Sequence, residues 1–170
     1  MAKNLFSLLA QKIESLNRGV YYTASLAILL SAFVLTYEVI IRYILRAPTI
    51  WEIEFSVYLI IMATYLGAAY GLKDGAHINI NIVVRLLPNE VKRKLSLLTS
   101  LLSWAFCIIL AWKGWEMWWE ATSKGWRSES LWGPPLTIPY IFLPIGMTLL
   151  SLQYLILIVG LMRGGETHGS

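Results

Sequence analysis

The sequence predicts an all-α integral membrane protein with four transmembrane helices. Four long segments carry no charged side chain, and the first three hold about 18 to 19 residues each. That length is close to the roughly 20 residues that a helix needs to cross a bilayer. The apolar fraction is 57% and the mean hydropathy is +0.61. Because a backbone in lipid must satisfy its own hydrogen bonds, these segments are expected to be helices, in a single membrane domain of residues 1–170.

The chain begins with a segment that is amphipathic at helical spacing. Within residues 4–17, the residues Leu5, Leu9, Ile13 and Leu16 share one face, and polar side chains lie off it. This pattern predicts an N-terminal interfacial amphipathic helix in the headgroup plane; a cytosolic helix packed on a partner is the alternative. No removable signal peptide is expected, because the first apolar run is too long and lacks a small-residue cleavage site.

The four spans are expected at about residues 20–41, 53–72, 95–112 and 138–162. The third helix is expected to continue past the membrane, because charged residues recur at three- and four-residue spacing up to Lys124. Pro144 predicts a kink in the fourth span. Residues 76–90 are ambiguous: their alternating pattern fits a strand by period, but an interfacial segment that turns helical suits a membrane protein better.

The distribution of lysine and arginine predicts the orientation. Nine of these residues fall at the two chain ends and in the loop between the second and third spans, against five on the other side. Positive residues favour the cytoplasm, so both termini are expected to be cytoplasmic. The net charge of +4 then reflects cytoplasmic loops, and no nucleic-acid partner is expected.

The small numbers of cysteine and histidine residues argue against redox, haem and metal chemistry in this chain. The single cysteine, Cys107, has no partner for a disulfide or a redox pair, and the two histidines, His77 and His168, lie outside the spans. The chain alone therefore cannot ligate a haem between its helices, and a metal or cofactor site is not expected. There is no nucleophile–base set, phosphate-binding glycine loop or paired-charge path. We expect a membrane scaffold and not an enzyme.

Charged residues gather where the first two spans approach their outer ends. Glu38 lies one helical turn from Arg42, which favours an ion pair; a proton-coupling acid is the alternative. Glu52 and Glu54 begin the second span, where the helix dipole favours negative charge. Arg42 or Arg46 could also meet these two acids across the turn. These five residues are the candidate outer-face ion pairs.

Seven of the eight tryptophans fall near the outer boundary or beyond it. An interfacial belt explains some of them, and tryptophan beyond the lipid is often buried against protein. The outer surface is therefore a candidate docking site, with self-packing of the two outer loops as the alternative. The residues chosen for docking are Trp51, Trp115, Trp119 and Trp126.

Small residues recur every four positions on the second span, at Ala63, Gly67 and Gly71. Such a face lets another helix approach closely. Either another span of this chain or a different subunit could occupy it.

The chain contains several short sequence motifs whose order and spacing resemble those of a known family. This family is the small membrane subunit of tripartite ATP-independent periplasmic (TRAP) transporters, the DctQ-like family. The resemblance covers about residues 20–161. Two positions depart from the family pattern: Ile53 and Asn81 stand where acids are usual. The residues that carry the resemblance are Arg42–Tyr43, Trp51, Glu54, Gly67–Ala68–Ala69, Gly75–Ala76–His77–Ile78, Leu87–Pro88, Pro139–Tyr140 and Leu143–Pro144–Ile145–Gly146.

The resemblance implies an accessory subunit of a sodium-coupled, binding-protein-dependent importer of organic acids in the bacterial inner membrane. Its implied partners are a large multi-span transport subunit, a periplasmic substrate-binding protein and membrane lipids. Sodium and substrate sites are expected in the large subunit, and the small-residue face at Ala63, Gly67 and Gly71 is a candidate contact with it. A stand-alone four-helix exporter coupled to protons through Glu38 is the alternative.

Overall fold

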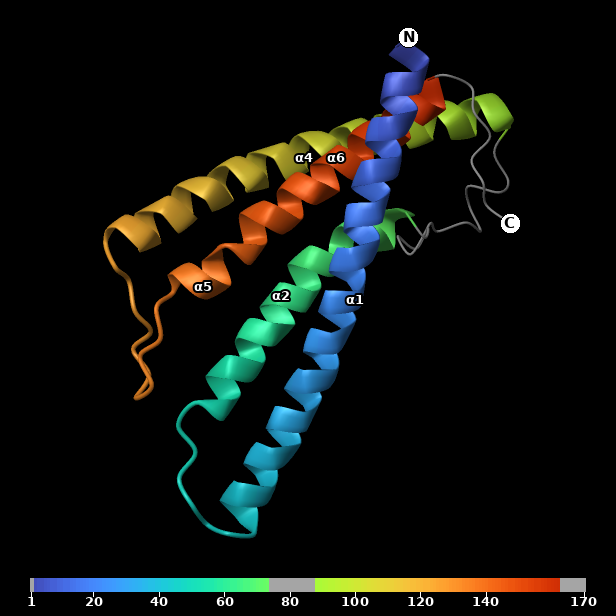
Figure 1. Cartoon of the computed structure of the whole chain (residues 1–170). Coiled ribbons are helices and arrows are strands. Elements are labelled where there is room, and N and C mark those ends of the chain that lie inside the picture. Colours follow the sequence, from blue (N-terminus) through green and yellow to red (C-terminus); the bar gives the residue numbers. More distant parts are fainter. Residues whose placement is uncertain (1, 74–87, 163–170) are drawn as a thin grey trace.

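The computed structural model describes residues 2–73 and 88–162, and this part of the chain is helical apart from its loops and one isolated bridge between Arg127 and Pro135 (Figure 1). Three segments are long and apolar enough to cross a membrane: Asn17–Tyr43, Val91–Ser123 and Thr137–Met162. The helices are α1 (Ala2–Tyr43), α2 (Glu52–Lys73), α4 (Asn89–Ser123), α5 (Thr137–Tyr140) and α6 (Phe142–Met162).

Helix α1 differs from the prediction at its amino end. A separate helix over residues 4–17 was expected, but α1 is continuous for 42 residues and includes both that segment and the first span. The physical reason is local: no proline interrupts Ala2–Tyr43, and the single glycine, Gly19, disfavours a helix by only about 1 kcal/mol. Asn17, at the expected junction, is buried inside the helix layer.

Helix α4 extends beyond the predicted third span at both ends. It starts directly after Pro88, whose fixed φ and missing N–H suit a helix start, and it runs 35 residues to Ser123. The predicted continuation past residue 112 is confirmed. Gly125 (φ 62°) then ends the helix in a left-handed conformation, and the Trp126 N–H donates to the Ala121 carbonyl at 2.9 Å. The alternating segment before Pro88 lies outside the described residues.

The predicted fourth span is divided into α5 and α6 at Ile141. Pro144 has no N–H to donate to the carbonyl four residues earlier, so the helix is weakened just before it. Regular hydrogen bonding resumes when the Ile145 N–H donates to the Ile141 carbonyl at 3.3 Å. The kink predicted from Pro144 is therefore present as a short interruption.

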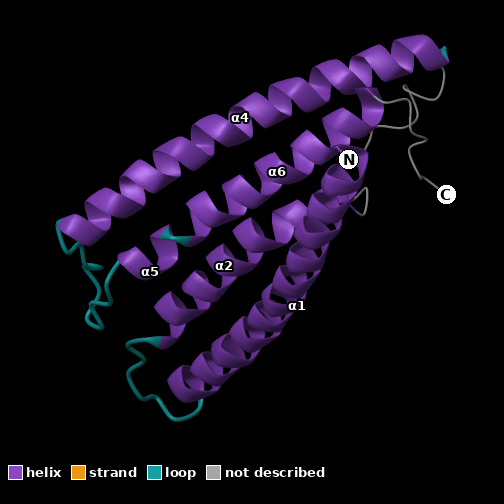
Figure 2. Ribbon diagram, turned by 45° about the horizontal axis from the view of Figure 1, so that its top comes forward, coloured by secondary structure: helices purple, strands orange, loops and turns teal. Residues whose placement is uncertain are grey.

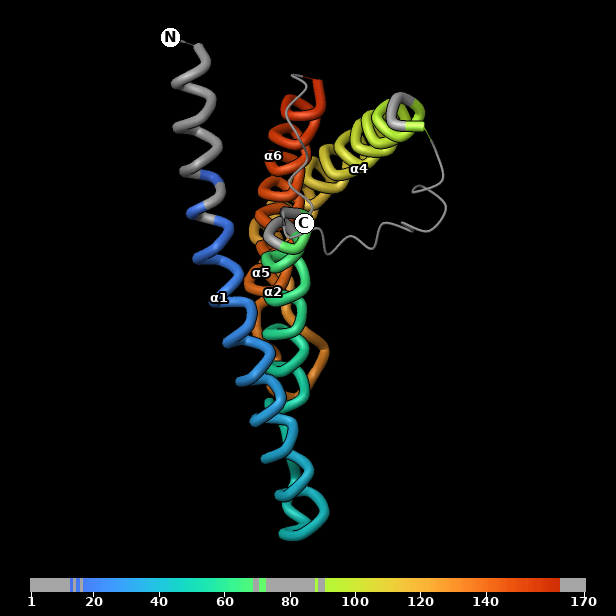
Figure 3. The backbone as a smooth tube through the Cα atoms, turned by 90° about the vertical axis from the view of Figure 1, so that its right-hand side faces the viewer, coloured from blue at the N-terminus to red at the C-terminus, as the bar shows by residue number. Residues whose placement is uncertain are grey.

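The helices form one fan-shaped layer rather than a closed bundle. Helix α2 packs between α1 and α6, and α4 packs on the other side of α6. Figure 1 shows this order, and Figures 2 and 3 show α1 and α4 on opposite sides of α2 and α6. The loops of residues 44–51 and 124–136 lie at the same end of the layer, which we call the two-loop end.

Helix α6 approaches both of its neighbours at glycines. A Cβ at Gly146 would overlap the backbone oxygen and carbon of Tyr65 on α2, so only glycine fits at this position. On the other side, a Cβ at Gly114 of α4 would lie 3.2 Å from the backbone nitrogen of Pro144. The two glycines therefore permit the backbone contacts that hold α2, α6 and α4 together.

Polar side chains join the same helices away from the glycines. The buried Asn17 Nδ2 of α1 donates to Gln153 Oε1 of α6 at 3.0 Å, and Ser31 Oγ donates to the Ser56 carbonyl of α2 at 3.3 Å. Arg93 Nη2 of α4 donates to the Leu161 carbonyl at 3.0 Å, which satisfies a free group at the end of α6. Each of these bonds joins two different helices, and the paired residues are at least 25 positions apart.

The glycine contact predicts a specific sensitivity. Gly146→Ala should destabilise the fold by about 1–3 kcal/mol, because the new methyl group can be accommodated only if the α2 and α6 backbones move apart. The measurement is the apparent melting temperature of the full chain in detergent, followed by tryptophan fluorescence.

Gly160→Ala is the matched control, because Gly160 lies on the same helix and, among the described residues, no atom beyond its own helical turn lies within 4 Å of the added methyl group. It should leave the melting temperature unchanged or raise it, since alanine favours a helix more than glycine does. Equal melting temperatures for the two variants would contradict the proposed close contact.

Candidate functional site

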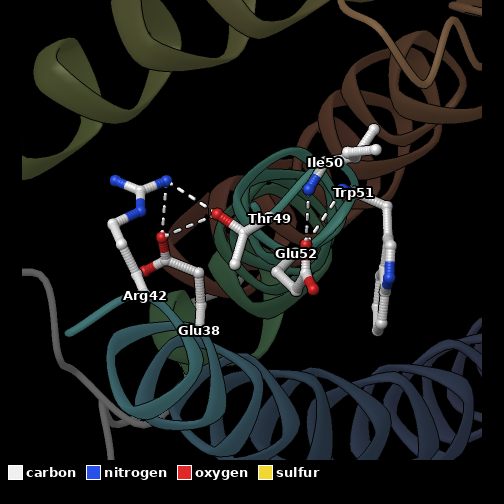
Figure 4. A network of polar contacts seen from close by, with 6 residues as sticks. All are labelled: Glu38, Arg42, Thr49, Ile50, Trp51 and Glu52. Carbon is white, nitrogen blue, oxygen red and sulfur yellow. Dashed lines mark hydrogen bonds and ion pairs between the residues drawn. The ribbon is translucent and has the colours of Figure 1, made fainter. Parts of the chain in front are cut away.

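The two-loop end holds a polar network at the turn between α1 and α2 (Figure 4). Glu38 is 6% exposed, and its Oε1 lies 2.7 Å from Arg42 Nη2, one turn along α1. Arg42 Nη2 also donates to Thr49 Oγ1 at 2.8 Å, and Thr49 Oγ1 donates to Glu38 Oε1 at 3.3 Å. A buried carboxylate is thereby held with a cation and a hydroxyl, which is the arrangement that a buried charge requires.

Glu52 bonds to backbone N–H groups at the start of its own helix. Its Oε2 accepts the N–H groups of Ile50 and Trp51 at 2.9 and 3.0 Å, and the residue is buried. The carboxylate thus satisfies donors just before α2, where the helix dipole also favours negative charge. Of the two explanations offered by the sequence, the helix-end role fits this geometry. A pair of Glu52 with Arg42 or Arg46 is not formed among the described residues.

Glu54 links α2 to the second loop. Its Oε1 accepts the Tyr58 hydroxyl at 3.0 Å, and its Oε2 accepts the Ser130 hydroxyl. The Tyr58 ring lies 6.5 Å, between centroids, from the ring of Trp132. Tyr58 could have been predicted as a partner of Glu54, because it lies four residues further along the same helix. Ser130 could not have been predicted from the local sequence, because it is 76 positions away.

The four tryptophans chosen for docking do not form one cluster. Trp119 is exposed and Trp115 packs edge-on against Trp118 at 5.6 Å, whereas Trp51 packs on Phe55. The indole of Trp126 lies 5.9 Å from Lys124 Nζ. Some of these tryptophans therefore pack against other aromatic residues of this chain. Trp112 and Trp119 are exposed, and we call these two residues the exposed aromatic edge of α4. Docking at this edge stays a prediction.

The small-residue face of α2 is covered by this chain's own α1. Ala63 is buried in a cluster with Ala24 and Ala27, and a Cβ at Gly67 would lie 3.7 Å from Ala24 Cβ. The prediction that Ala63 and Gly67 contact another subunit is therefore wrong. These two residues form a contact between two helices of this chain. The reason is that α1 itself supplies small residues, so the two helices approach closely. Gly71, further along α2, is partly exposed.

Hydroxyl side chains in the helices mostly bond to their own backbone. The pattern is donation to a carbonyl three or four residues earlier, which leaves little capacity for a polar path through the layer. Among the described residues there is also no group of three potential metal ligands. The hydroxyls that follow this pattern are Thr23, Ser25, Thr36, Thr99, Thr122, Ser123, Thr148 and Ser151.

These features define a class of protein: a multi-pass helical membrane protein in which the ion pairs of the described residues lie toward the two-loop end. Comparison with known proteins gives the family. The family model for tripartite ATP-independent periplasmic transporters, DctQ component, matches residues 31–164. The chain therefore belongs to the DctQ family, and it is a multi-pass protein of the bacterial inner membrane.

Similar proteins carry consistent names. The chain is 28% identical over 142 residues to the C4-dicarboxylate TRAP transporter small permease protein DctQ of Vibrio cholerae serotype O1, covering 69% of this chain and 60% of that protein. It is 29% identical over 131 residues to the ectoine TRAP transporter small permease protein TeaB of Halomonas elongata, covering 77% and 67%. The chain thus spans about two thirds or less of these relatives. The family is one of transporter subunits, and the comparisons give no support to a stand-alone exporter.

The Glu38–Arg42 pair yields a test of its role. Arg42→Gln should lower stability by about 1–3 kcal/mol, because it leaves a buried carboxylate without its cation. The effect should be smaller than for a fully buried pair, since the Arg42 side chain is half exposed. The measurement is again the melting temperature in detergent.

The double variant Glu38→Gln with Arg42→Gln is the control, because it removes the unpaired charge as well. It should melt above Arg42→Gln alone. If the double variant melts no higher, then Glu38 does not depend on Arg42 for its stability in the fold.

Proposed function

We propose that this chain is the small accessory subunit of a sodium-coupled importer of organic acids that receives its substrate from a periplasmic binding protein. The single observation that carries the proposal is the match of residues 31–164 to the DctQ component family. Relatives named as small permease proteins for C4-dicarboxylates and for ectoine support a transporter role without fixing the substrate of this chain.

The geometry of the chain favours a scaffold role over a conduit. The buried Glu38 is paired with Arg42, and most helix hydroxyls bond to the backbone of their own helices. A conduit needs polar groups that are free to replace the hydration of a solute. We therefore assign sodium and substrate binding to a large multi-span subunit, with no cofactor in this chain.

The proposed topology has four spans and both termini in the cytoplasm. Helix α2, with 22 residues and a length of about 33 Å, is the proposed fourth span beside the three apolar segments. The excess of lysine and arginine at the other end assigns the two-loop end to the periplasm. In this orientation the first turns of α1 extend toward the cytoplasmic headgroups, as an interfacial segment continuous with the first span.

The proposal has a direct test in reconstituted vesicles. The full chain should co-purify with a large multi-span subunit encoded beside it, and uptake should require both chains, a binding protein and a sodium gradient. Uptake by vesicles that contain only this chain would contradict the scaffold role. Uptake by the large subunit at an undiminished rate without this chain would contradict a required accessory role.

A second prediction concerns the exposed aromatic edge on α4. Trp119→Ala should weaken binding of the soluble partner to the assembled complex by roughly 5- to 30-fold, which corresponds to about 1–2 kcal/mol for an interface aromatic. The measurement is binding of the periplasmic protein to the complex in nanodiscs.

Phe106→Ala is the matched control, because Phe106 is similarly exposed on α4 but lies over three turns earlier, within the apolar segment. It should leave soluble-partner binding unchanged in complexes that assemble. Loss of co-purification for Trp119→Ala would assign that tryptophan to subunit assembly instead of docking.

A further inference from the structure

The turn between α1 and α2 lies where a headgroup layer must be. The apolar segment Asn17–Tyr43 has 27 residues, about 40 Å of helix, which matches the roughly 40–45 Å of a bilayer including its headgroups. The loop of residues 44–51 follows this segment directly, and Glu52 then begins α2. With eight residues between the two helices, the loop can rise only about 13 Å above their ends before the chain must return.

The outer side of this loop is apolar. Ile44 and Leu45 are 73% and 63% exposed, and Tyr43, Ile50 and Trp51 are exposed around them. Such side chains are unfavourable in water, but aliphatic residues beside tyrosine and tryptophan are the composition of a membrane interface. The loop thus presents a surface suited to the boundary between headgroups and acyl chains.

Arg46 is the one charged residue of loop 44–51, and the two carboxylates nearest to the loop along the chain are buried and bonded. Glu38 and Glu52 are each 6% exposed and bonded to Arg42 and to backbone N–H groups, respectively. Arg46 is exposed and has no hydrogen-bond or ion-pair partner among the described residues. Its φ of 51° lies in the left-handed region, which an arginine rarely adopts. This conformation turns the chain away at the end of α1, where the Ala47 N–H donates to the Ile41 carbonyl at 3.3 Å.

We propose that loop 44–51 is a phospholipid site, in which the Arg46 guanidinium binds the phosphate of an anionic phospholipid while Ile44 and Leu45 insert between acyl chains. Charge complementarity selects this occupant: a guanidinium donates two parallel hydrogen bonds to a phosphate, and the surrounding aliphatic side chains match the acyl region. An arginine at the end of a span also extends readily to the headgroups. The proposal goes beyond the subunit role and requires only that the chain lie in a membrane.

The first experiment measures phospholipid affinity by native mass spectrometry of the full purified chain titrated with phosphatidylglycerol. Arg46→Gln should reduce the affinity about fivefold, the effect of one cationic side chain at a membrane surface. Lys124→Gln is the matched control, because Lys124 is also an exposed cation at the two-loop end but is already paired with Glu120 at 2.5 Å. It should leave the affinity unchanged. Equal affinities for the wild type and Arg46→Gln, or equal losses for both variants, would overturn the proposal.

The second experiment places the loop directly and does not depend on the stability of the Arg46 variant. A spin label on Leu45→Cys, in a Cys107→Ala background, should be accessible to lipid-dissolved oxygen and shielded from a water-soluble nickel complex in phosphatidylglycerol nanodiscs. A label on Glu129→Cys, in the other loop, provides the comparison for an exposed polar position. A Leu45 label that is open to the nickel complex would overturn the proposal. Shielding that arises only when the large subunit is present would assign the surface to a protein contact instead, and neither result would alter the proposed subunit role.

Discussion

The close approach of α6 to its two neighbours is the constraint on which the rest of the structure depends. Gly146 brings the α6 backbone against Tyr65 of α2, and Gly114 brings α4 against Pro144, within one turn of α6. In lipid, helices gain little from excluding water, so backbone proximity and packing must hold them together. Because both contacts occur on the same turn, this part of α6 fixes α2 and α4 relative to each other.

The arrangement at the two-loop end follows from that central contact. Once α2 and α4 are placed on either side of α6, the start of α2 and the loop after α4 lie at the same end, where Glu54 accepts the Ser130 hydroxyl. The loop itself is closed by its own backbone, since the Leu136 N–H donates to the Trp126 carbonyl at 2.9 Å. The carboxylate therefore joins two preformed segments and does not need to order a long free loop.

Sequence reasoning predicted the helices well and their contacts poorly, for a physical reason. In a soluble helix, the polar face marks the outside, so periodicity reports which side packs. In a membrane helix both sides are apolar, and this contrast is lost. The apolar runs, the extension of α4 and the break near Pro144 could be predicted, because length, charge spacing and proline chemistry are local. The Asn17–Gln153 bond joins residues 136 positions apart, and the covering of Ala63 by Ala24 also depends on which helices meet.

The open layer explains why this chain is expected to work with a partner. In a closed four-helix bundle every helix packs against two neighbours. Here α1 packs mainly on α2 alone, and α4 packs mainly on α6 alone. In the most apolar 18-residue stretch of Val91–Ser123 only 11% of the residues are buried, and in that of Asn17–Tyr43 22%, against 39% for the segment that contains α6. Lipid can cover such surfaces, but it provides no fixed shape. The proposed accessory role calls for an apolar face that a helical partner can cover. The layer offers one on each side, because α2 and α4 contact α6 through backbone approaches near its centre.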